Sequence, residues 1–193
     1  MNLPNKLTIS RMIITPIFLF VLMFGRIPHS FLFAAIIFAI AAITDAVDGK
    51  LARKNNQITV VGKLLDPVAD KMLTTSAYLG FLALGYCDVW SIMLILAREF
   101  VVTSIRLVAS AQGVVIPANI WGKIKTASQM VVIIVVMLMG ELRYCADRYG
   151  FMSFPIETMQ LISHILVWIT VVLTVISGIT YIVAAKKRID FSK

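Results

Sequence analysis

Four aspartates, Asp45, Asp48, Asp66 and Asp70, lie on either side of one short polar connection between two long apolar segments. A carboxylate in or beside a bilayer core costs several kcal/mol unless another group compensates it, so such a residue indicates a functional site. Like charges also raise one another's pKa, so four neighbouring carboxylates need a shared cationic partner to stay ionised. Oxygen ligands without His or Cys favour Mg²⁺, Mn²⁺ or Ca²⁺ over zinc. Because two such ions can clamp phosphate oxygens, the sequence predicts displacement at phosphorus.

The spacing of the aspartates predicts that they converge. Asp45 and Asp48 are three residues apart and Asp66 and Asp70 are four apart, so each pair shares one face of a helix. The members of the two pairs are about 4.5 Å and about 6 Å apart along their helices. The two helices run in opposite directions, which brings both pairs to the same depth in one leaflet. Salt bridges with neighbouring lysines and arginines are the alternative, but two matched pairs exceed what packing requires.

The composition predicts an all-α integral membrane protein. Hydrophobic residues make up 60% of the 193 residues, and the mean hydropathy is +0.91. A spanning helix needs roughly 20 apolar residues, so the chain holds about six spans in a single membrane domain, residues 1–193. The first apolar run is not followed by a small-residue cleavage site, so we expect it to remain as a helix. Clusters of Gly, Pro, Asn and charged residues separate the six predicted transmembrane helices, which are Leu7–Phe24, Ser30–Ala52, Val60–Leu84, Trp90–Ala111, Ile120–Met139 and Glu157–Ala185.

The distribution of positive charge predicts the orientation of these helices. With six spans, both termini and most lysines fall on one side, whereas only Arg26, Arg143 and Arg148 fall on the other, diluted by acidic residues. The positive-inside rule makes the lysine-rich side, and therefore both termini, cytoplasmic. The net charge of +8 then favours contact with anionic membrane lipids. It does not indicate a nucleic-acid partner, because no basic face carries interleaved aromatic residues.

The acidic segment also resembles a known family. It is similar to the complete signature of the CDP-alcohol phosphotransferases, in the pattern Asp45-x-x-Asp48-Gly49-x-x-Ala52-Arg53 followed by Gly62-x-x-x-Asp66-x-x-x-Asp70. The N-terminal stretch from Asn2 to Arg11 resembles that family as well, so the resemblance covers nearly the whole chain. Members of the family transfer a phosphatidyl-type group from a CDP-linked lipid to an alcohol and release CMP. The resemblance therefore implies the same reaction here.

The resemblance implies a role for each matching residue. Asp45, Asp48 and Asp66 are expected to bind two divalent ions, Mg²⁺ or Mn²⁺, and Asp70 to be both a ligand and the general base for the acceptor hydroxyl. Asp70 is the deeper acid of its pair, which suits a base that must reach the acceptor proton. The resemblance also indicates an enzyme of the bacterial cytoplasmic membrane, and the predicted topology places its active site on the cytoplasmic side. The residues expected along CDP-diacylglycerol are Gly49, Ala52, Arg53, Gly62, Asn5 and Thr8.

Cations in the later helices indicate the acceptor. Arg98 and Arg106 interrupt an apolar segment and lie about 80° apart around a helix, so both can line one cavity. Lys123 follows at the start of the next helix. Cations that face a membrane cavity need an anion, and the guanidinium fork suits phosphate. The sequence therefore favours a phosphorylated acceptor. These segments resemble those of family members that use sn-glycerol 3-phosphate to make phosphatidylglycerophosphate.

Several alternatives stay open at this level. Inositol phosphate, serine or phosphatidylglycerol is the alternative acceptor within the family. A cation transporter is the alternative outside it, although a transport path would distribute polar groups over the full membrane depth. Cys87 and Cys145 both fall in predicted outer loops, where an oxidising exterior permits a disulfide without requiring one. The oligomeric state, including a homodimer, is also open.

Other polar residues receive structural interpretations. Pairing with Glu99 is not expected to be the sole role of Arg98, because adjacent residues on a helix point about 100° apart. Extension of Arg106 to the lipid headgroups is the alternative to a role in the acceptor pocket. Lys125 is expected to face solvent. His29, which falls in or near the predicted outer half, is expected to be incidental.

Overall fold

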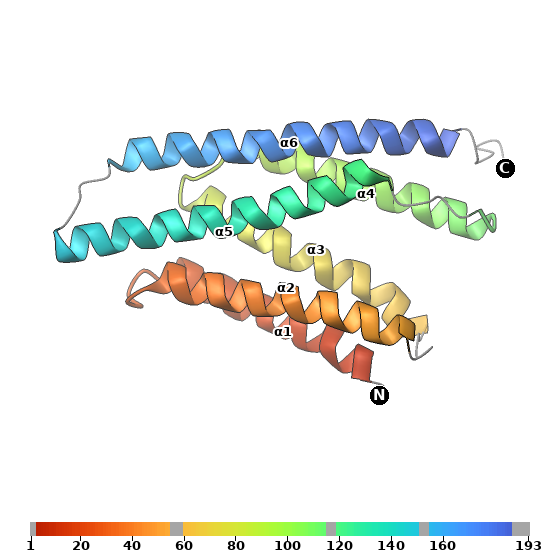
Figure 1. The fold of residues 1–193 in the computed structure, drawn as a ribbon, viewed down its shortest axis with the longest axis horizontal. Helices are drawn as coiled ribbons and strands as arrows, with labels where there is room; N and C mark the ends of the chain where they lie inside the picture. The colour runs from red at the N-terminus through yellow and green to blue at the C-terminus, as the bar shows by residue number, and fades with distance from the viewer. Residues whose placement is uncertain (1–2, 55–59, 115–118, 151–154, 187–193) are drawn as a thin grey trace. The chain divides into compact units, whose positions relative to one another are not determined.

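The computed structural model describes residues 3–54, 60–114, 119–150 and 155–186, and the side chains at 3–7, 45–54, 60–67 and 70 lie outside this description. Within the described residues the chain forms six helices and no strand, as Figure 1 shows, so the predicted all-α class is confirmed. The helices are α1 (Leu3–Met23), α2 (Ser30–Lys54), α3 (Val60–Ala83), α4 (Val89–Ala111), α5 (Ile120–Tyr149) and α6 (Ile156–Lys186).

The helix bounds agree closely with the sequence prediction except at the end of α5. The sequence predicts an end at Met139, but the helix continues to Tyr149. Its last turns are charged, and Arg143 Nε lies 3.4 Å from Asp147 Oδ2, one turn further along the helix. Opposite charges four residues apart stabilise a helix. When only the composition of the segment is considered, the same charged residues indicate a loop. The predicted outer loop is therefore wrong at Cys145, which lies within α5.

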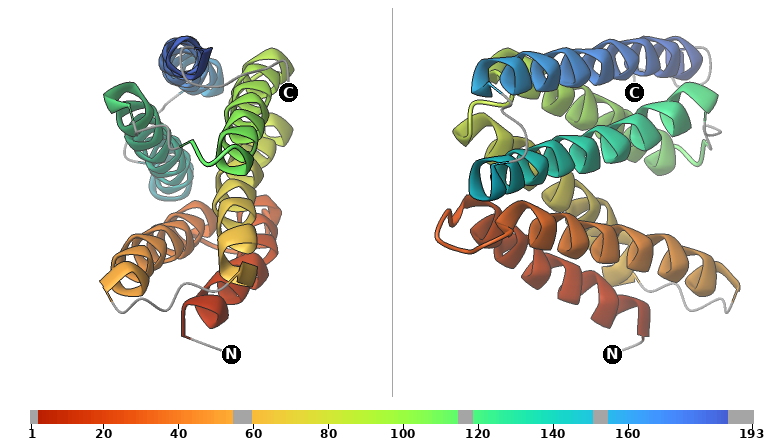
Figure 2. Two further views of the ribbon diagram at one scale, coloured as in Figure 1. Left: turned by 90° about the vertical axis from the view of Figure 1, so that its right-hand side faces the viewer. Right: turned by 60° about the vertical axis from the view of Figure 1, so that its left-hand side comes forward.

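The chain divides into two compact units. Unit 1 comprises residues 1–84 and 133–159, and unit 2 comprises residues 85–132 and 160–193. In unit 1, α1 packs against both α2 and α3, and it runs antiparallel to α2 (Figure 2). The buried rings of Phe18 and Phe38, with centroids 5.8 Å apart, join α1 to α2. At Gly80, a Cβ would lie only 2.6 Å from Leu22 Cδ2, so the absence of a side chain lets α3 approach α1. These contacts hold the two helices that carry the aspartates.

Unit 2 contains α4, the first turns of α5 and most of α6. Asp88 caps α4, because its carboxylate accepts a hydrogen bond from Ser91 N at 3.0 Å. The same carboxylate accepts a hydrogen bond from Trp168 Nε1 on α6 at 2.9 Å, which joins the two helices. Burial acts to raise the pKa of Asp88, but these hydrogen bonds outweigh it and lower the pKa. Further along the two helices, the buried residues Ala109 and Ala185 belong to one cluster. Thus α6 packs along α4 in the same direction.

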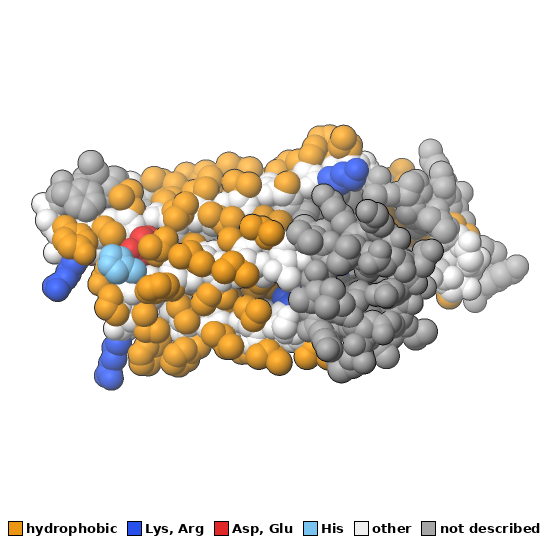
Figure 3. Space-filling model, turned by 60° about the horizontal axis from the view of Figure 1, so that its bottom comes forward, with side chains coloured by type: hydrophobic (Ala, Val, Ile, Leu, Met, Phe, Trp, Pro, Cys, Tyr) orange, Lys and Arg blue, Asp and Glu red, His pale blue; other side chains and the backbone are white. Residues whose placement is uncertain are grey.

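The surface of the described helices is largely apolar. Large hydrophobic side chains are exposed along them, such as Phe20 at 59%, Leu107 at 68% and Val183 at 53%, and hydrophobic side chains cover much of the described surface in Figure 3. Both α5 and α6 are long and apolar enough to cross a membrane, and Thr8–Met23 and Ser30–Thr44 are shorter apolar helical segments. A soluble monomer rarely exposes an apolar patch larger than about 600 Å². This surface therefore supports a membrane protein.

Candidate active site

The four aspartates lie on the helix ends that the sequence predicts. Asp45 and Asp48 belong to the last three turns of α2, and Asp66 and Asp70 belong to the first three turns of α3. Each pair keeps its helical spacing, so its two members share a helix face. Convergence of the four carboxylates stays a prediction, because their side chains lie outside the described residues. The same holds for the local surroundings of Gly49, Ala52, Arg53 and Gly62.

The start of α1 lies at the same end of unit 1. Because α1 and α2 are antiparallel neighbours, the first turns of α1 lie at the end of the unit where α2 finishes (Figures 1 and 2). Thr8 and Arg11, in these first turns, are buried, with exposed fractions of 3% and 5%. The side chain of Asn5, on the same helix, lies outside the described residues. The predicted contact of Asn5 and Thr8 with the CDP-lipid stays a prediction.

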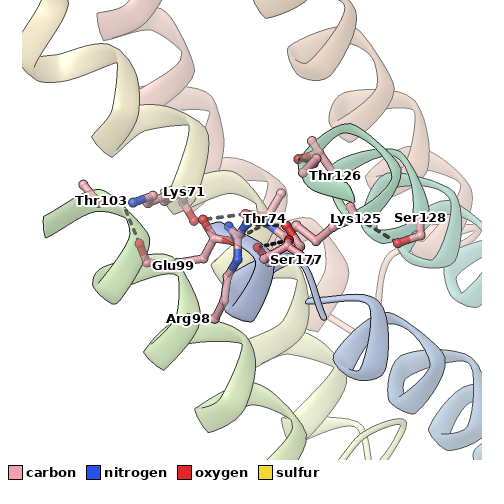
Figure 4. A network of polar contacts seen from close by, with 11 residues as sticks. Lys71, Thr74, Arg98, Glu99, Thr103, Lys125, Thr126, Ser128 and Ser177 are labelled. Atoms are coloured by element: carbon pink, nitrogen blue, oxygen red, sulfur yellow. Dashed lines mark hydrogen bonds and ion pairs between the residues drawn. The ribbon is translucent and has the colours of Figure 1, made fainter. Parts of the chain in front are cut away.

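A cluster of charged and polar side chains joins α4, α5 and α6 within unit 2 (Figure 4). Arg98 Nη2 donates a hydrogen bond to Ser177 Oγ at 2.6 Å, and Nη1 lies 3.3 Å from Glu99 Oε1. Lys125 Nζ donates to the same oxygen of Glu99. The Nε atom of Arg98 is buried and has no hydrogen-bond partner among the described residues. Arg98 is therefore oriented by its neighbours, and its Nε–H is a donor that no described residue uses.

Arg106 reaches the same face of α6. Its guanidinium carbon lies 5.3 Å from the centre of the Tyr181 ring, a cation–π contact. Ser177 and Tyr181 are four residues apart, so the two arginines of α4 meet one face of α6. Gly178 gives Arg98 room there, since a Cβ at Gly178 would lie 2.9 Å from Arg98 Cγ. The buried Tyr181 hydroxyl has no hydrogen-bond partner in the part of the chain that the structure describes.

The two lysines at the start of α5 have different environments. Lys125 is only 5% exposed and forms an ion pair with Glu99, so the expectation that it faces solvent is wrong. The physical reason is that an acid such as Glu99, within an apolar helix, needs cationic partners. Lys123 is exposed, and residues two apart on a helix do not face each other. The predicted contact of Lys123 with the acceptor phosphate stays a prediction.

Sequence reasoning missed part of this cluster. It treats Glu99 only as a neighbour of Arg98, and it does not select Ser177 or Tyr181. Arg98 pairs with Glu99 although the two residues are adjacent on the helix, and Ser177 is a second partner. A signal does exist in the sequence, because Ser177, Gly178 and Tyr181 form a small and polar stripe in a largely apolar segment. Small and polar residues are enriched where membrane helices pack closely and form hydrogen bonds with each other.

Comparison with known proteins decides the family. The model of the family described as CDP-alcohol phosphatidyltransferase matches residues 1–176. The chain belongs to the CDP-alcohol phosphatidyltransferase family. It is 38% identical to the CDP-diacylglycerol–glycerol-3-phosphate 3-phosphatidyltransferase of Bacillus subtilis (strain 168), over 93% of this chain and 93% of that protein. The proteins of the same name from Rickettsia bellii and Pseudomonas fluorescens are 35% and 36% identical, over 96% and 71% of this chain and 96% and 72% of those proteins.

This CDP-alcohol phosphatidyltransferase is therefore a membrane enzyme that transfers a phosphatidyl group, and the resemblance seen in the aspartate motif is confirmed. Membership of a transferase family rules against the cation transporter. The family is generally dependent on divalent metals. The predicted ligand set of four carboxylates offers only oxygen donors, which fit Mg²⁺ or Mn²⁺. One other group of metal-ligating side chains occurs among the described residues, formed by His29, Glu141 and Cys145.

Proposed function

We propose that the protein transfers the phosphatidyl group of CDP-diacylglycerol to sn-glycerol 3-phosphate, giving phosphatidylglycerophosphate and CMP. The names of its relatives support these substrates. The observation that carries the acceptor assignment is the placement of Arg98 and Arg106, which both meet one face of α6. A phosphorylated acceptor matches these cations. Serine or an unphosphorylated polyol offers no phosphate for them.

In this proposal Asp45, Asp48, Asp66 and Asp70 hold two divalent ions, Mg²⁺ or Mn²⁺. The location of these residues on the connected ends of α2 and α3 supports the assignment, as does the set of oxygen-only donors. When bound, the ions neutralise charge on the pyrophosphate of CDP-diacylglycerol. The residues that contact the nucleotide and its pyrophosphate are Asn5, Thr8, Gly49, Ala52, Arg53 and Gly62.

Asp70 acts as the general base for the acceptor. As the acceptor hydroxyl attacks, Asp70 takes its proton, and a bond forms between the hydroxyl oxygen and the phosphorus of the phosphatidyl group. The bond from this phosphorus to the oxygen of CMP breaks, and CMP leaves with the electron pair. General-base catalysis of this kind contributes about 10²- to 10⁴-fold to the rate. The position of Asp70 one turn beyond Asp66 on α3 supports this division of roles.

Arg98, Arg106 and Lys123 bind the phosphate of glycerol 3-phosphate in this proposal. The buried Nε of Arg98 has no hydrogen-bond partner among the described residues. It can donate a hydrogen bond to a phosphate oxygen. A guanidinium fork binds two phosphate oxygens at once, which favours Arg over Lys at this position. Glu99 and Lys125 hold Arg98 in a defined environment rather than binding the substrate themselves.

In the proposed topology, the whole chain, residues 1–193, forms one membrane domain with six transmembrane helices. Both termini lie in the cytoplasm, and the aspartate site faces the cytoplasm. The membrane is the cytoplasmic membrane of a bacterium. The exposed apolar side chains along the helices support the six spans. The excess of lysine on the side that contains the termini supports the orientation.

A panel of acceptors tests the proposed function. Purified protein in detergent receives CDP-diacylglycerol, Mg²⁺ and one acceptor, and CMP release is measured while mass spectrometry identifies the lipid product. Glycerol 3-phosphate should give CMP and phosphatidylglycerophosphate, whereas glycerol, serine, inositol phosphate and phosphatidylglycerol should give only the background rate. The Asp70→Asn variant defines that background. Turnover with another acceptor in place of glycerol 3-phosphate would keep the family reaction and overturn the acceptor.

A further inference from the structure

His29, Glu141 and Cys145 gather at one end of unit 1. One ligand atom from each residue lies within 4.8 Å of the ligand atoms of the other two. His29 Nδ1 is 2.5 Å from Glu141 Oε1, and Cys145 Sγ is 3.4 Å from the same oxygen. Glu141 and Cys145 are one turn apart on α5, and His29 directly precedes α2. The three side chains therefore come from two segments that are far apart in the sequence.

We propose that these residues bind a divalent ion of the zinc class. Imidazole, carboxylate and thiolate are the protein ligands that Zn²⁺ uses, whereas Mg²⁺ and Mn²⁺ do not select a thiolate. With metal–ligand distances of about 2.0–2.3 Å, neighbouring ligand atoms around tetrahedral zinc are about 3.3–3.8 Å apart. The ligand atoms of His29, Glu141 and Cys145 all lie within 4.8 Å of one another, which is close to this spacing. The fourth position is open to water, and the Cys145 thiol proton passes to solvent when the ion binds.

The surroundings hold the ligands in place. Glu141 is only 8% exposed, and its second oxygen accepts a hydrogen bond from Leu32 N at 3.1 Å. Hydrogen bonds of this kind fix the orientation of metal-binding side chains. His29 has a φ of 55°, in the left-handed region that residues other than glycine adopt rarely. Such conformations occur mainly where the surroundings impose them, and they cluster at functional sites. The His29 side chain is 34% exposed, which gives an ion access from water.

This site is separate from the aspartates. Asp45 lies on α2, about 22 Å along the helix from its start beside His29. The two sites also differ in ligands, since one offers oxygen only and the other offers nitrogen, oxygen and sulfur. Capping of α2 by Glu141 uses only the oxygen that accepts from Leu32 N. The imidazole and the thiol meet at the other oxygen, where they form hydrogen bonds without an ion and can act together as ligands with one.

Cobalt titration tests the site, because a thiolate bound to Co²⁺ gives a charge-transfer absorption that carboxylates do not give. The purified full-length protein, kept under argon with excess Mg²⁺, is titrated with Co²⁺ and then with Zn²⁺. The absorption should saturate at about one ion per chain and disappear when Zn²⁺ displaces the cobalt. Cys145→Ser should abolish the absorption. His29→Ala should weaken Co²⁺ binding more than about tenfold, since even loss of an outer partner costs that much.

Cys87 provides the matched control. It is only 3% exposed, and burial together with the neighbouring charge of Asp88 raises the pKa of its thiol to about 12. The Cys87→Ala variant should therefore keep the absorption. Mg²⁺-dependent CMP release shows that each variant is folded, and Cys145→Ala replaces Cys145→Ser if the latter is inactive. The proposal is overturned if the wild-type protein shows no absorption, if the absorption survives loss of Cys145, or if it depends on Cys87.

Discussion

Arg98 Nη2 on α4 donates a hydrogen bond to Ser177 Oγ on α6 at 2.6 Å. Glu99 engages a second nitrogen of the same guanidinium, at 3.3 Å. The fork is therefore oriented before a ligand arrives, and a preorganised group binds with a lower entropic cost. In the proposed function, acceptor binding should depend on this side chain more than on any other cation of the cluster.

The first prediction follows from that role. Arg98→Ala should lower kcat/KM for glycerol 3-phosphate about 10- to 150-fold, which corresponds to about 1.5–3 kcal/mol for a lost charge-assisted hydrogen bond. The KM for CDP-diacylglycerol should change little, because the aspartate site binds that substrate. Arg98→Lys should recover only part of the loss, since an ammonium cannot fork to two oxygens. Wild-type acceptor kinetics in Arg98→Ala would contradict the assignment.

The second prediction concerns the space beside Arg98. In Gly178→Ala the new Cβ would lie 2.9 Å from Arg98 Cγ, so the arginine must move. Because small displacements of a positioning group are costly, kcat/KM for glycerol 3-phosphate should fall about tenfold or more. Gly122→Ala is the matched control, since its Cβ would meet Ser177 Oγ at an ordinary 3.8 Å. Steady-state kinetics should separate the two variants, and equal losses in both would rule out displacement of Arg98 as the cause.

The third prediction separates the two lysines of α5. Lys125→Met removes a buried cation from Glu99, and breaking a buried pair is strongly destabilising, so the Tm in detergent should fall. Lys123→Met changes an exposed side chain, so its Tm should stay at the wild-type value while the KM for glycerol 3-phosphate rises. Thermal unfolding and acceptor kinetics on both variants check this. A stable Lys125→Met with unchanged kinetics would show that Glu99 does not need this partner.

The sequence predicts the helices well because their ends carry strong local signals. Gly, Pro and charged clusters separate long apolar runs, and apolar runs of this length have few alternatives to a helix in a membrane. The exception is the last part of α5, where Arg143 and Asp147 continue the helix through a pair at helical spacing. Composition alone does not distinguish such a pair from the charges of a loop.

The candidate site is predictable only in part, for a physical reason. The aspartates stand out because a carboxylate in an apolar segment needs compensation, and their spacing is set along one helix. The contacts of Arg98 with Ser177 and of Lys125 with Glu99 join different helices, and they depend on how those helices are rotated against each other. Neither propensity nor periodicity within one segment contains that information. The meeting of His29 with Glu141 is a contact of the same kind.

The fourth prediction concerns the metal. Chelation of divalent ions should abolish CMP release, and Mg²⁺ or Mn²⁺ should restore it. Asp45→Asn, Asp48→Asn and Asp66→Asn each remove a ligand charge while nearly preserving shape, so each should lose activity and require more metal. Asp70→Asn should stay inactive even at saturating metal, because it also lacks the base. Full activity in excess chelator would overturn the two-metal proposal.

The last prediction concerns orientation in the membrane. Tyr149, at the end of α5, is 66% exposed and should face the cell exterior, whereas Asn56, which lies outside the described residues, should face the cytoplasm. Tyr149→Cys and Asn56→Cys are made in a Cys145→Ser background and treated on intact cells with an impermeant thiol reagent. Cys87 can remain, because its buried thiol has a pKa raised to about 12 and so carries almost no thiolate near pH 7. Labelling of Cys87 should rise about tenfold for each pH unit, since the thiolate is the reactive form.

Labelling at position 149 alone is the expected result. Labelling at position 56 alone would place the aspartate site on the wrong side of the membrane for a cytosolic acceptor.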